Sequence, residues 1–236
     1  MKSVLSGVTR GDLERDPFPH VVIDQALDRD LYRALAASMP DDATLLDGRE
    51  LANNSAYHFR AARILAAAAP LWQEFVRLHT SAAFFQEVVT LFGLDLHDVT
   101  TSIRGSEEPA GAALDCQITY GSPVTQPTRC HPVHVDRPVA LYAGLLYFRR
   151  DDDDSTGGDL ELYRFKGPRA YDAMRIVDDA LVERVKTIPY AANRLVFFIH
   201  SRDALHGVST RSVTPHPRLH VNFLAEFRQP VWELAA

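Results

Sequence analysis

One segment of the chain reads His131-Pro132-Val133-His134-Val135-Asp136. In an extended strand, residues two positions apart point to the same face, so His134 and Asp136 can reach one ligand together. His206 lies much later in the sequence, again in a strand-like context. A sheet can bring such distant residues side by side, so the spacing predicts neighbouring strands that share a site of two imidazoles and one carboxylate.

These three side chains form a recognisable donor set. Two imidazoles and one carboxylate occupy one face of an octahedral ion and leave three positions open, as in mononuclear non-haem Fe(II) oxygenases. The same donors also suit Zn²⁺. The short motif alone is weak, because a chain with ten histidines contains about one His-x-Asp match by composition. The surrounding sequence therefore has to support the assignment.

Apolar and alternating segments surround these residues and predict a set of strands. The segments are 140–148, 159–165, 194–199, 204–209 and 218–224. Between the first two, the run Asp151 to Asp154 lacks the alternating ligands and distal glutamate of a calcium loop, so we expect a solvated turn. Gly157-Gly158 has no lysine or helix start after it and is interpreted as a tight entry into the next strand.

The ordered motifs resemble the Fe(II)/2-oxoglutarate-dependent dioxygenases, in particular their prolyl-4-hydroxylase-like branch. The resemblance covers roughly residues 112–228 and implies a mostly β fold with flanking helices, a double-stranded β-helix or jelly roll. Its motifs are His134-x-Asp136, Gly157-Gly158-Asp159-Leu160-Glu161-Leu162-Tyr163, Asn193-Arg194-Leu195-Val196-Phe197-Phe198, Leu205-His206-Gly207-Val208 and Arg218.

The resemblance also assigns roles to individual residues. It implies that His134, Asp136 and His206 are the catalytic iron ligands, and that Arg218 binds the far carboxylate of 2-oxoglutarate. Tyr120 stands near the place of a tyrosine that helps to hold the same carboxylate. The implied cofactor is Fe(II), with 2-oxoglutarate and O2 as cosubstrates and succinate and CO2 as products. Because Asp136 is a carboxylate, we expect hydroxylation or a related C–H oxidation and not halogenation.

The first hundred residues have a mainly helical pattern of apolar residues, and we expect them to form a buttress that packs on the sheet. Residues 18–23 predict a strand, Asp28 an N-cap, and Pro40 the end of the helix that follows. Residues 41–57 have no clear period and predict a loop, whereas 59–92 is helical with breaks near Pro70 and Thr80. Residues 103–112 predict an exposed turn. We interpret 1–236 as one domain, with 1–100 as the buttress and 112–228 as the catalytic core.

Composition narrows the possible partners. A net charge of −6 and the absence of a basic run argue against nucleic acid. No apolar run approaches the ~20 residues that span a bilayer, so we expect no membrane partner. The N-terminus has no apolar signal region and the chain has two cysteines, Cys116 and Cys130, which favours a cytoplasmic protein with reduced thiols. No feature of the sequence indicates an oligomeric state.

Several residues keep two interpretations at this stage. His131 is a weaker candidate ligand than His134, because Val133 stands where the carboxylate is needed. His200 either lines the site or only ends its strand, and Tyr142 and Asn222 either face a pocket or are ordinary strand residues. A further set could meet an acidic substrate: Arg60, Arg63 and Arg104.

The substrate class is also open. We expect a small molecule, such as an amino acid, a sugar or a natural-product intermediate, contacted by the N-terminal helices and by loops such as 41–57 and 121–131. The alternative within the same class is a protein or carrier-bound substrate. Two other hypotheses are a zinc hydrolase, which leaves Arg218 without a role, and a non-catalytic jelly-roll binding module.

Overall fold

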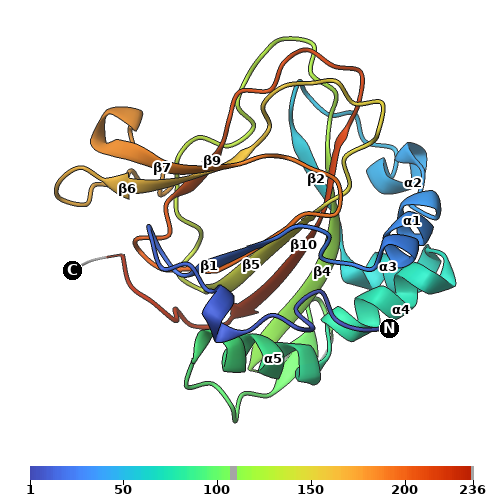
Figure 1. The fold of residues 1–236 in the computed structure, drawn as a ribbon, viewed down its shortest axis with the longest axis horizontal. Helices are drawn as coiled ribbons and strands as arrows, with labels where there is room; N and C mark the ends of the chain where they lie inside the picture. Colours follow the sequence, from blue (N-terminus) through green and yellow to red (C-terminus); the bar gives the residue numbers. More distant parts are fainter. Residues whose placement is uncertain (107–110, 235–236) are drawn as a thin grey trace.

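Two β-sheets face each other and enclose part of the core (Figure 1). The computed structural model describes residues 1–106 and 111–234. The larger sheet has the order β1 His20–Ile23, β8 Leu195–Ile199, β5 Ala140–Tyr147, β10 Arg218–Phe227, β4 Ala112–Gly121 and β2 Ala56–Phe59, with β3 Thr101–Ile103 paired in parallel to β4. The smaller sheet has the order β7 Val182–Ile188, β6 Leu160–Phe165 and β9 His206–Val208.

The helices come from the first part of the chain. They are α1 Arg29–Ala37, α2 Asp42–Leu46, α3 Ala61–Ala67, α4 Pro70–His79 and α5 Ala82–Phe92, with short 3-10 turns at Arg10–Asp12 and Asp179–Leu181. Local chemistry explains where they begin. Asp28 accepts from the backbone N–H groups of Asp30 and Leu31, and Pro70 opens α4, where no N–H partner is needed. In the described residues, none of the helices has the length and apolarity that crossing a membrane requires.

The helices pack on the outer face of the larger sheet. In Figure 1 they lie beside β4 and β10, away from β6, β7 and β9. The packing follows from alternation along β4, because Leu114, Cys116, Ile118 and Tyr120 join the helix side chains in one core cluster. The alternate residues Gln117, Thr119 and Gly121 line a cavity between the sheets. One face of the sheet is therefore used for packing and the other for a cavity.

A second apolar cluster joins the two sheets. Ala143, Tyr147, Val196 and Phe198 of the larger sheet pack with residues of the smaller sheet, namely Leu160, Leu162 and Ile188. This cluster closes the space behind the cavity. Ala143, Leu160 and Phe198 of this cluster also line the cavity, together with polar residues.

Most of the predicted elements are confirmed, including the N-cap at Asp28 and the helix breaks at Pro70 and Thr80. The loop predicted for 41–57 is wrong in part. Asp41 caps the short helix α2 through the N–H of Thr44, and β2 forms because Ala56–Phe59 pairs with β4. That pairing is a tertiary contact, so the local period of the sequence does not reveal it.

Three smaller predictions also need correction. The segment 131–136 is not a strand, and only His134 forms an isolated bridge, to His206 and Ile176. In the predicted solvated turn, Asp153 is buried and forms an ion pair of 2.8 Å with the buried Arg211. Of the segment 103–112, residues 107–110 lie outside the described part of the chain, and Ala112 is buried at the start of β4.

Candidate functional site

His134 and His206 are held together by their own backbones. The N–H of His134 donates to the carbonyl of His206 at 2.9 Å, and the N–H of His206 donates back at 3.0 Å. Each ring places Nδ1 against the carbonyl two residues earlier, that of Pro132 at 2.8 Å and that of Ala204 at 2.9 Å. Nδ1 therefore carries the proton in both rings, and both Nε2 atoms keep a lone pair that can bind a metal.

Apolar neighbours fix this pair from behind. Val133, Val135 and Leu205 alternate with the site residues and are buried in one cluster with Val177 and Tyr163. Burial of these side chains orients the loop that carries His134 even though the loop is not a regular strand. The apolar residues that alternate with the site residues in the sequence therefore anchor this loop in the core.

Asp136 completes the group. One ligand atom each from His134, Asp136 and His206 lies within 4.8 Å of the other two. Asp136 Oδ2 is 3.5 Å from His206 Nε2. The structure therefore brings together the three residues that the sequence analysis selected, and their donor atoms fit a single metal ion with open positions.

Electrostatics favours the protonation states that a metal requires. Burial alone would raise the pKa of Asp136, but the surrounding histidines, with His200 and His206 foremost, hold it below its ordinary value. Burial lowers the pKa of His206, and the nearby His134 adds to this effect. An ionised carboxylate beside neutral imidazoles is the state in which these side chains bind a cation.

Arg218 lies in the same cavity and is nearly buried. Its Nε donates to the carbonyl of Gly158 at 2.8 Å, and its guanidinium stands 5.1 Å above the Tyr147 ring and 5.0 Å above the Tyr190 ring. Nη1 lies 3.2 Å from Nδ1 of His220, whose pKa burial lowers well below its ordinary value. A fixed guanidinium in a cavity is suited to bind a carboxylate through two hydrogen bonds.

The structure does not support the role expected for Tyr120. Its side chain points to the helix face of β4, and its hydroxyl donates to Asp42 at 2.9 Å. Thr119 and Gly121, on either side, line the cavity instead. Tyr120 is therefore not placed to hold a carboxylate beside Arg218. The transfer was wrong because the resemblance did not fix which face of the strand the residue occupies.

His200 and His131 flank the group of three without joining it. His200 Nε2 lies 3.4 Å from Asp136 Oδ2, and the ring is buried, with Nδ1 unpartnered among the described residues. Burial lowers the pKa of His200, so the ring is neutral. His131 lines the cavity with its ring 5.8 Å from that of His134, and burial lowers its pKa to about 4. The expectation that His134, and not His131, stands with the carboxylate agrees with this arrangement.

The remaining candidates divide between cavity and surface. Asn222, Arg60 and Arg104 line the cavity. Arg63 instead forms an exposed ion pair with Asp47 at 2.5 Å, and Tyr142 is buried in the helix-side core. The sequence analysis did not single out Gln117 and His58, which also line the cavity. For Gln117 the signal was available in the alternation of polar and apolar residues along β4.

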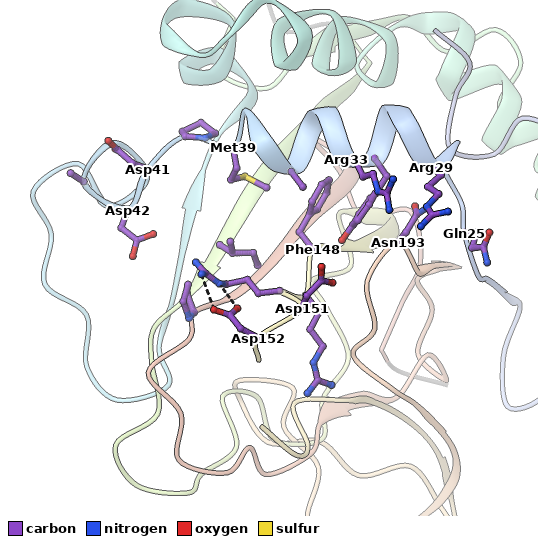
Figure 2. Close-up of a pocket in the computed structure, with 18 residues that line it drawn as sticks. Gln25, Arg29, Arg33, Met39, Asp41, Asp42, Phe148, Asp151, Asp152 and Asn193 are labelled. Atoms are coloured by element: carbon purple, nitrogen blue, oxygen red, sulfur yellow. Dashed lines mark hydrogen bonds and ion pairs between the residues drawn. The ribbon is translucent and has the colours of Figure 1, made fainter. Parts of the chain in front are cut away.

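A larger groove of ≈ 1340 Å³ lies elsewhere, between α1 and the segment after β5 (Figure 2). Arg29 and Arg33 project from α1, Asp151 lies across the groove from them, and Asp152 is paired with Arg150 (Figure 2). The metal-ligating group lies in the smaller cavity of ≈ 360 Å³. We therefore place the functional site in the smaller cavity, because size without reactive or metal-binding side chains does not define a site.

Comparison with known proteins supports the fold. No family model and no curated protein matches the sequence. Among solved structures, a prolyl 4-hydroxylase from Phytophthora capsici matches with a TM-score of 0.55 and 16% identity over 89% of this chain, which spans only 59% of that chain. A Pseudomonas putida prolyl-4-hydroxylase matches with a TM-score of 0.50 and 17% identity over 89% of this chain and 93% of that one.

A third similar solved structure is a carbocyclase and not a prolyl hydroxylase. The non-heme alpha-ketoglutarate-dependent carbocyclase SnoK from nogalamycin biosynthesis matches with a TM-score of 0.53 and 16% identity, over 92% of this chain and 83% of that one. At these identities the likeness shows a shared fold. The fold expected from the sequence motifs, that of the prolyl 4-hydroxylases and related oxygenases, is thereby confirmed.

Proposed function

We propose that this protein is an Fe(II)- and 2-oxoglutarate-dependent oxygenase that hydroxylates, or otherwise oxidises at a C–H bond, a small-molecule substrate, with release of succinate and CO2. One observation carries the proposal. Two histidines with free Nε2 atoms, an ionised aspartate and a buried arginine line the same cavity. Shared fold with oxygenases adds support but is an analogy.

In this proposal His134, Asp136 and His206 hold the metal. Bound iron would supply the oxidising chemistry that amino-acid side chains lack. The backbone pairing of His134 with His206 sets the positions of the two nitrogens before any ion arrives. Their Nδ1 contacts fix the ring orientation, so little reorganisation accompanies binding.

Arg218 then binds the far carboxylate of 2-oxoglutarate. Its hydrogen bond to Gly158 and its position over two tyrosine rings hold the guanidinium in one orientation. Burial removes competing water and strengthens the attraction to a carboxylate. A hydrolase with bound zinc would leave this buried charge without a purpose, which favours the oxygenase over that alternative.

The architecture is consistent with a jelly-roll catalytic core at 112–228 with a helical buttress at 1–100. The two facing sheets supply the core, and one apolar cluster joins the helices to the outer face of the larger sheet. This continuous core supports the interpretation of residues 1–236 as a single domain.

The proposal can be tested without knowing the substrate, by measuring the conversion of 2-oxoglutarate to succinate by the protein alone. Purified protein is reconstituted with Fe(II), supplied with 2-oxoglutarate and air, and assayed for succinate with and without metal. We expect iron-dependent succinate that Asp136→Ala and His134→Ala each lower by at least about tenfold. His97→Ala is the matched control, because His97 is exposed and bonds only to Gln86. Full succinate production by either site variant would overturn the assignment.

A further inference from the structure

We propose that the cavity binds a carboxylate group of the substrate at the end formed by Arg60 and Arg104. The proposal rests on the oxygenase function above and names the substrate class: a small organic acid. Both arginines line the cavity that contains His134, Asp136 and His206.

Strand alternation brings Arg60 to the cavity. Ala56 and His58 of β2 line the cavity, and Arg60 follows with the same parity just after the strand ends. β2 is held in this register because His58 pairs with Thr119 of β4, with His58 Nδ1 3.0 Å from the Thr119 hydroxyl. Arg60 is exposed, and the sheet register places it at the rim of the cavity.

Arg104 arrives from a different element. It follows β3, and its N–H donates to the carbonyl of Leu114 at 2.8 Å, which extends the pairing of β3 with β4. Its guanidinium lies 2.9 Å from Glu226 Oε2, and Arg137 binds the other oxygen of the same carboxylate. Glu226 is thus shared by two arginines at this end of the cavity.

The local charge balance is positive. In the described part of the chain, Arg60 has no side-chain partner, whereas Arg104 and Arg137 share the single carboxylate of Glu226. A buried carboxyl, Asp115, lies nearby on β4; burial raises its pKa, and Arg104 and Arg60 oppose this shift. Even with Asp115 ionised, the three guanidinium groups of Arg60, Arg104 and Arg137 face two carboxylates. An anionic ligand would complete the pairing of these guanidinium groups.

This end of the cavity is distinct from the Arg218 end. Arg218 of β10 aligns with Gly121 of β4, and Gly121 aligns with Ala56 of β2, so Arg60 lies four residues, or about 13 Å, further along the sheet than Arg218. Ile199 pairs with Tyr142, and Tyr142 pairs with Ala225, which places the residue after β8, His200, beside the Glu226 end. His200 contacts Asp136. Asp136 of the metal-ligating group therefore lies toward the Glu226 end, whereas Arg218 lies at the other end of β10.

Two amide side chains line the cavity between these ends. Gln117 and Asn222 are direct cross-strand partners on β4 and β10. Asn222 Oδ1 is buried and has no hydrogen-bond partner among the described residues. A buried acceptor left unpaired costs free energy, so a donor group on a bound ligand is suited to pair with Asn222 Oδ1.

The size of the cavity points to a small acid. Its volume of ≈ 360 Å³ is near the lower limit for pockets that bind small molecules, and the cosubstrate would fill part of it. The remaining space suits a compact compound whose carboxylate reaches Arg60 and whose reactive carbon lies near the metal-ligating group.

The test uses the holoprotein with Fe(II) and saturating 2-oxoglutarate under argon, titrated calorimetrically with two probe pairs. The pairs are phenylacetate with phenylacetamide and hexanoate with hexanamide. We expect at least one acid to bind, and its uncharged amide to bind at least about tenfold more weakly. Arg60→Gln should weaken the acid by roughly tenfold to hundredfold, because a charge-assisted hydrogen-bond pair is lost.

Arg63→Gln is the matched control. It removes an arginine three residues away that pairs with Asp47 outside the cavity, so acid binding should stay unchanged. The proposal is overturned if neither acid binds, if acid and amide bind equally, or if the two variants behave alike. Metal-dependent binding of 2-oxoglutarate is recorded first in the same sample. If 2-oxoglutarate does not bind, the oxygenase function is overturned. Acid binding that depends on Arg60 would still establish the carboxylate site in that case.

Discussion

At the scale of single residues, the two histidines are prepared for a metal by hydrogen bonds that lie outside the cavity. Nδ1 of His134 and Nδ1 of His206 each contact a backbone carbonyl, which sets the tautomer. Among the described residues, no backbone group bonds to the Asp136 side chain, whose Oδ2 lies 3.4 Å from His200 Nε2 and 3.5 Å from His206 Nε2. Because His206 Nε2 is itself a candidate metal ligand, His200 is the neighbour that is left to orient the carboxylate.

His200 gives the first prediction at this scale. We expect its Nε2–H to donate to Asp136 and to orient the carboxylate toward the metal. His200→Phe keeps the packing but removes the donor, and should lower metal affinity by about tenfold or more. His200→Gln can still donate and should retain most of the affinity. Competition with a chromogenic chelator, using Co(II), measures both variants.

The comparison between the two variants separates positioning from packing. If glutamine and phenylalanine weaken metal binding equally, His200 acts only by filling space. If neither variant changes the affinity, the contact with Asp136 has no role in orientation.

At this scale, the residue types and their order selected His134, Asp136, His206 and Arg218, and these four side chains line one cavity. Their roles as metal ligands and as the carboxylate partner stay predictions. Tyr120 was assigned wrongly, since the face of a strand depends on its register and not on nearness in sequence. The contact of His200 with Asp136 was also not predictable, because it joins a loop to the end of a distant strand.

At the scale of elements, the strand entry at Gly157-Gly158 supports Arg218. Both glycines have a positive φ, of 74° and 73°. A Cβ added at Gly157 would lie 1.9 Å from the carbonyl oxygen of Thr210, so no other residue fits without moving the backbone. The next residue, Gly158, offers the carbonyl that accepts from Arg218.

Replacement of Gly157 is the prediction for this element. Gly157→Ala should lower the free energy of unfolding by more than about 2 kcal/mol, through backbone strain and the clash with Thr210. It should also weaken 2-oxoglutarate binding, because Arg218 loses a fixed partner. Gly167→Ala is the control, since no atom lies within 4 Å of an added Cβ there. Urea unfolding and calorimetry measure the two effects, and equal behaviour of both variants would contradict the account.

The turn at Gly157-Gly158 was predicted correctly, and the loop at 41–57 was predicted wrongly in part. The difference is whether the structure of the segment leaves a signal in its own sequence. Paired glycines can be recognised from the sequence alone, because glycine adopts a positive φ without a steric penalty. β2 carries no local signal of that strength, because its four residues become a strand only by pairing with β4. The proposed substrate contact of Arg60 depends on that pairing, so the sequence offered Arg60 as a candidate but could not place it at the cavity.

At the scale of the whole molecule, His79 ties the N-terminal segment to the helices and the larger sheet. Its Nε2 accepts from the N–H of Val4 at 3.0 Å, and its Nδ1 lies 2.8 Å from the carbonyl of Phe75. Its ring contacts those of Phe84 and Phe223. The ring is neutral in this arrangement, because protonation of Nε2 would place a donor against the N–H of Val4.

Stability should therefore depend on pH. Burial lowers the pKa of His79 to about 4, below the unfolded value of 6.5. Between these values the unfolded chain binds a proton that the folded chain excludes, so stability falls as the pH falls from about 6.5 to about 4. The contribution of His79 is at most about 3 kcal/mol.

His79→Gln isolates this contribution from that of the other buried histidines. Glutamine offers an acceptor to Val4 but does not titrate, so the stability gap between wild type and variant should narrow over this pH range. Urea unfolding at several pH values measures the gap. A gap that stays constant from neutral pH to pH about 4 would show that His79 does not exclude the proton.

The overall fold was the most predictable feature. Alternating and apolar segments marked the strands at 140–148, 159–165, 194–199 and 218–224, and caps and breaks marked the helices. Strand β7 was not predicted, since Val182–Ile188 is largely exposed and carries little apolar alternation. The relation between the two sheets was available only from the ordered motifs, because sequence period does not determine which strands pair.

The measurement that tests the central claim most directly is the visible spectrum of the anaerobic protein with Fe(II) and 2-oxoglutarate. The oxygenase assignment predicts a weak charge-transfer band that requires both components and is lost in His206→Ala. Arg218→Ala should shift its appearance to higher 2-oxoglutarate concentration, because the far carboxylate loses its partner. If iron binds but 2-oxoglutarate produces no band, the cavity is not a 2-oxoglutarate site. The protein would then share only its fold with the oxygenases.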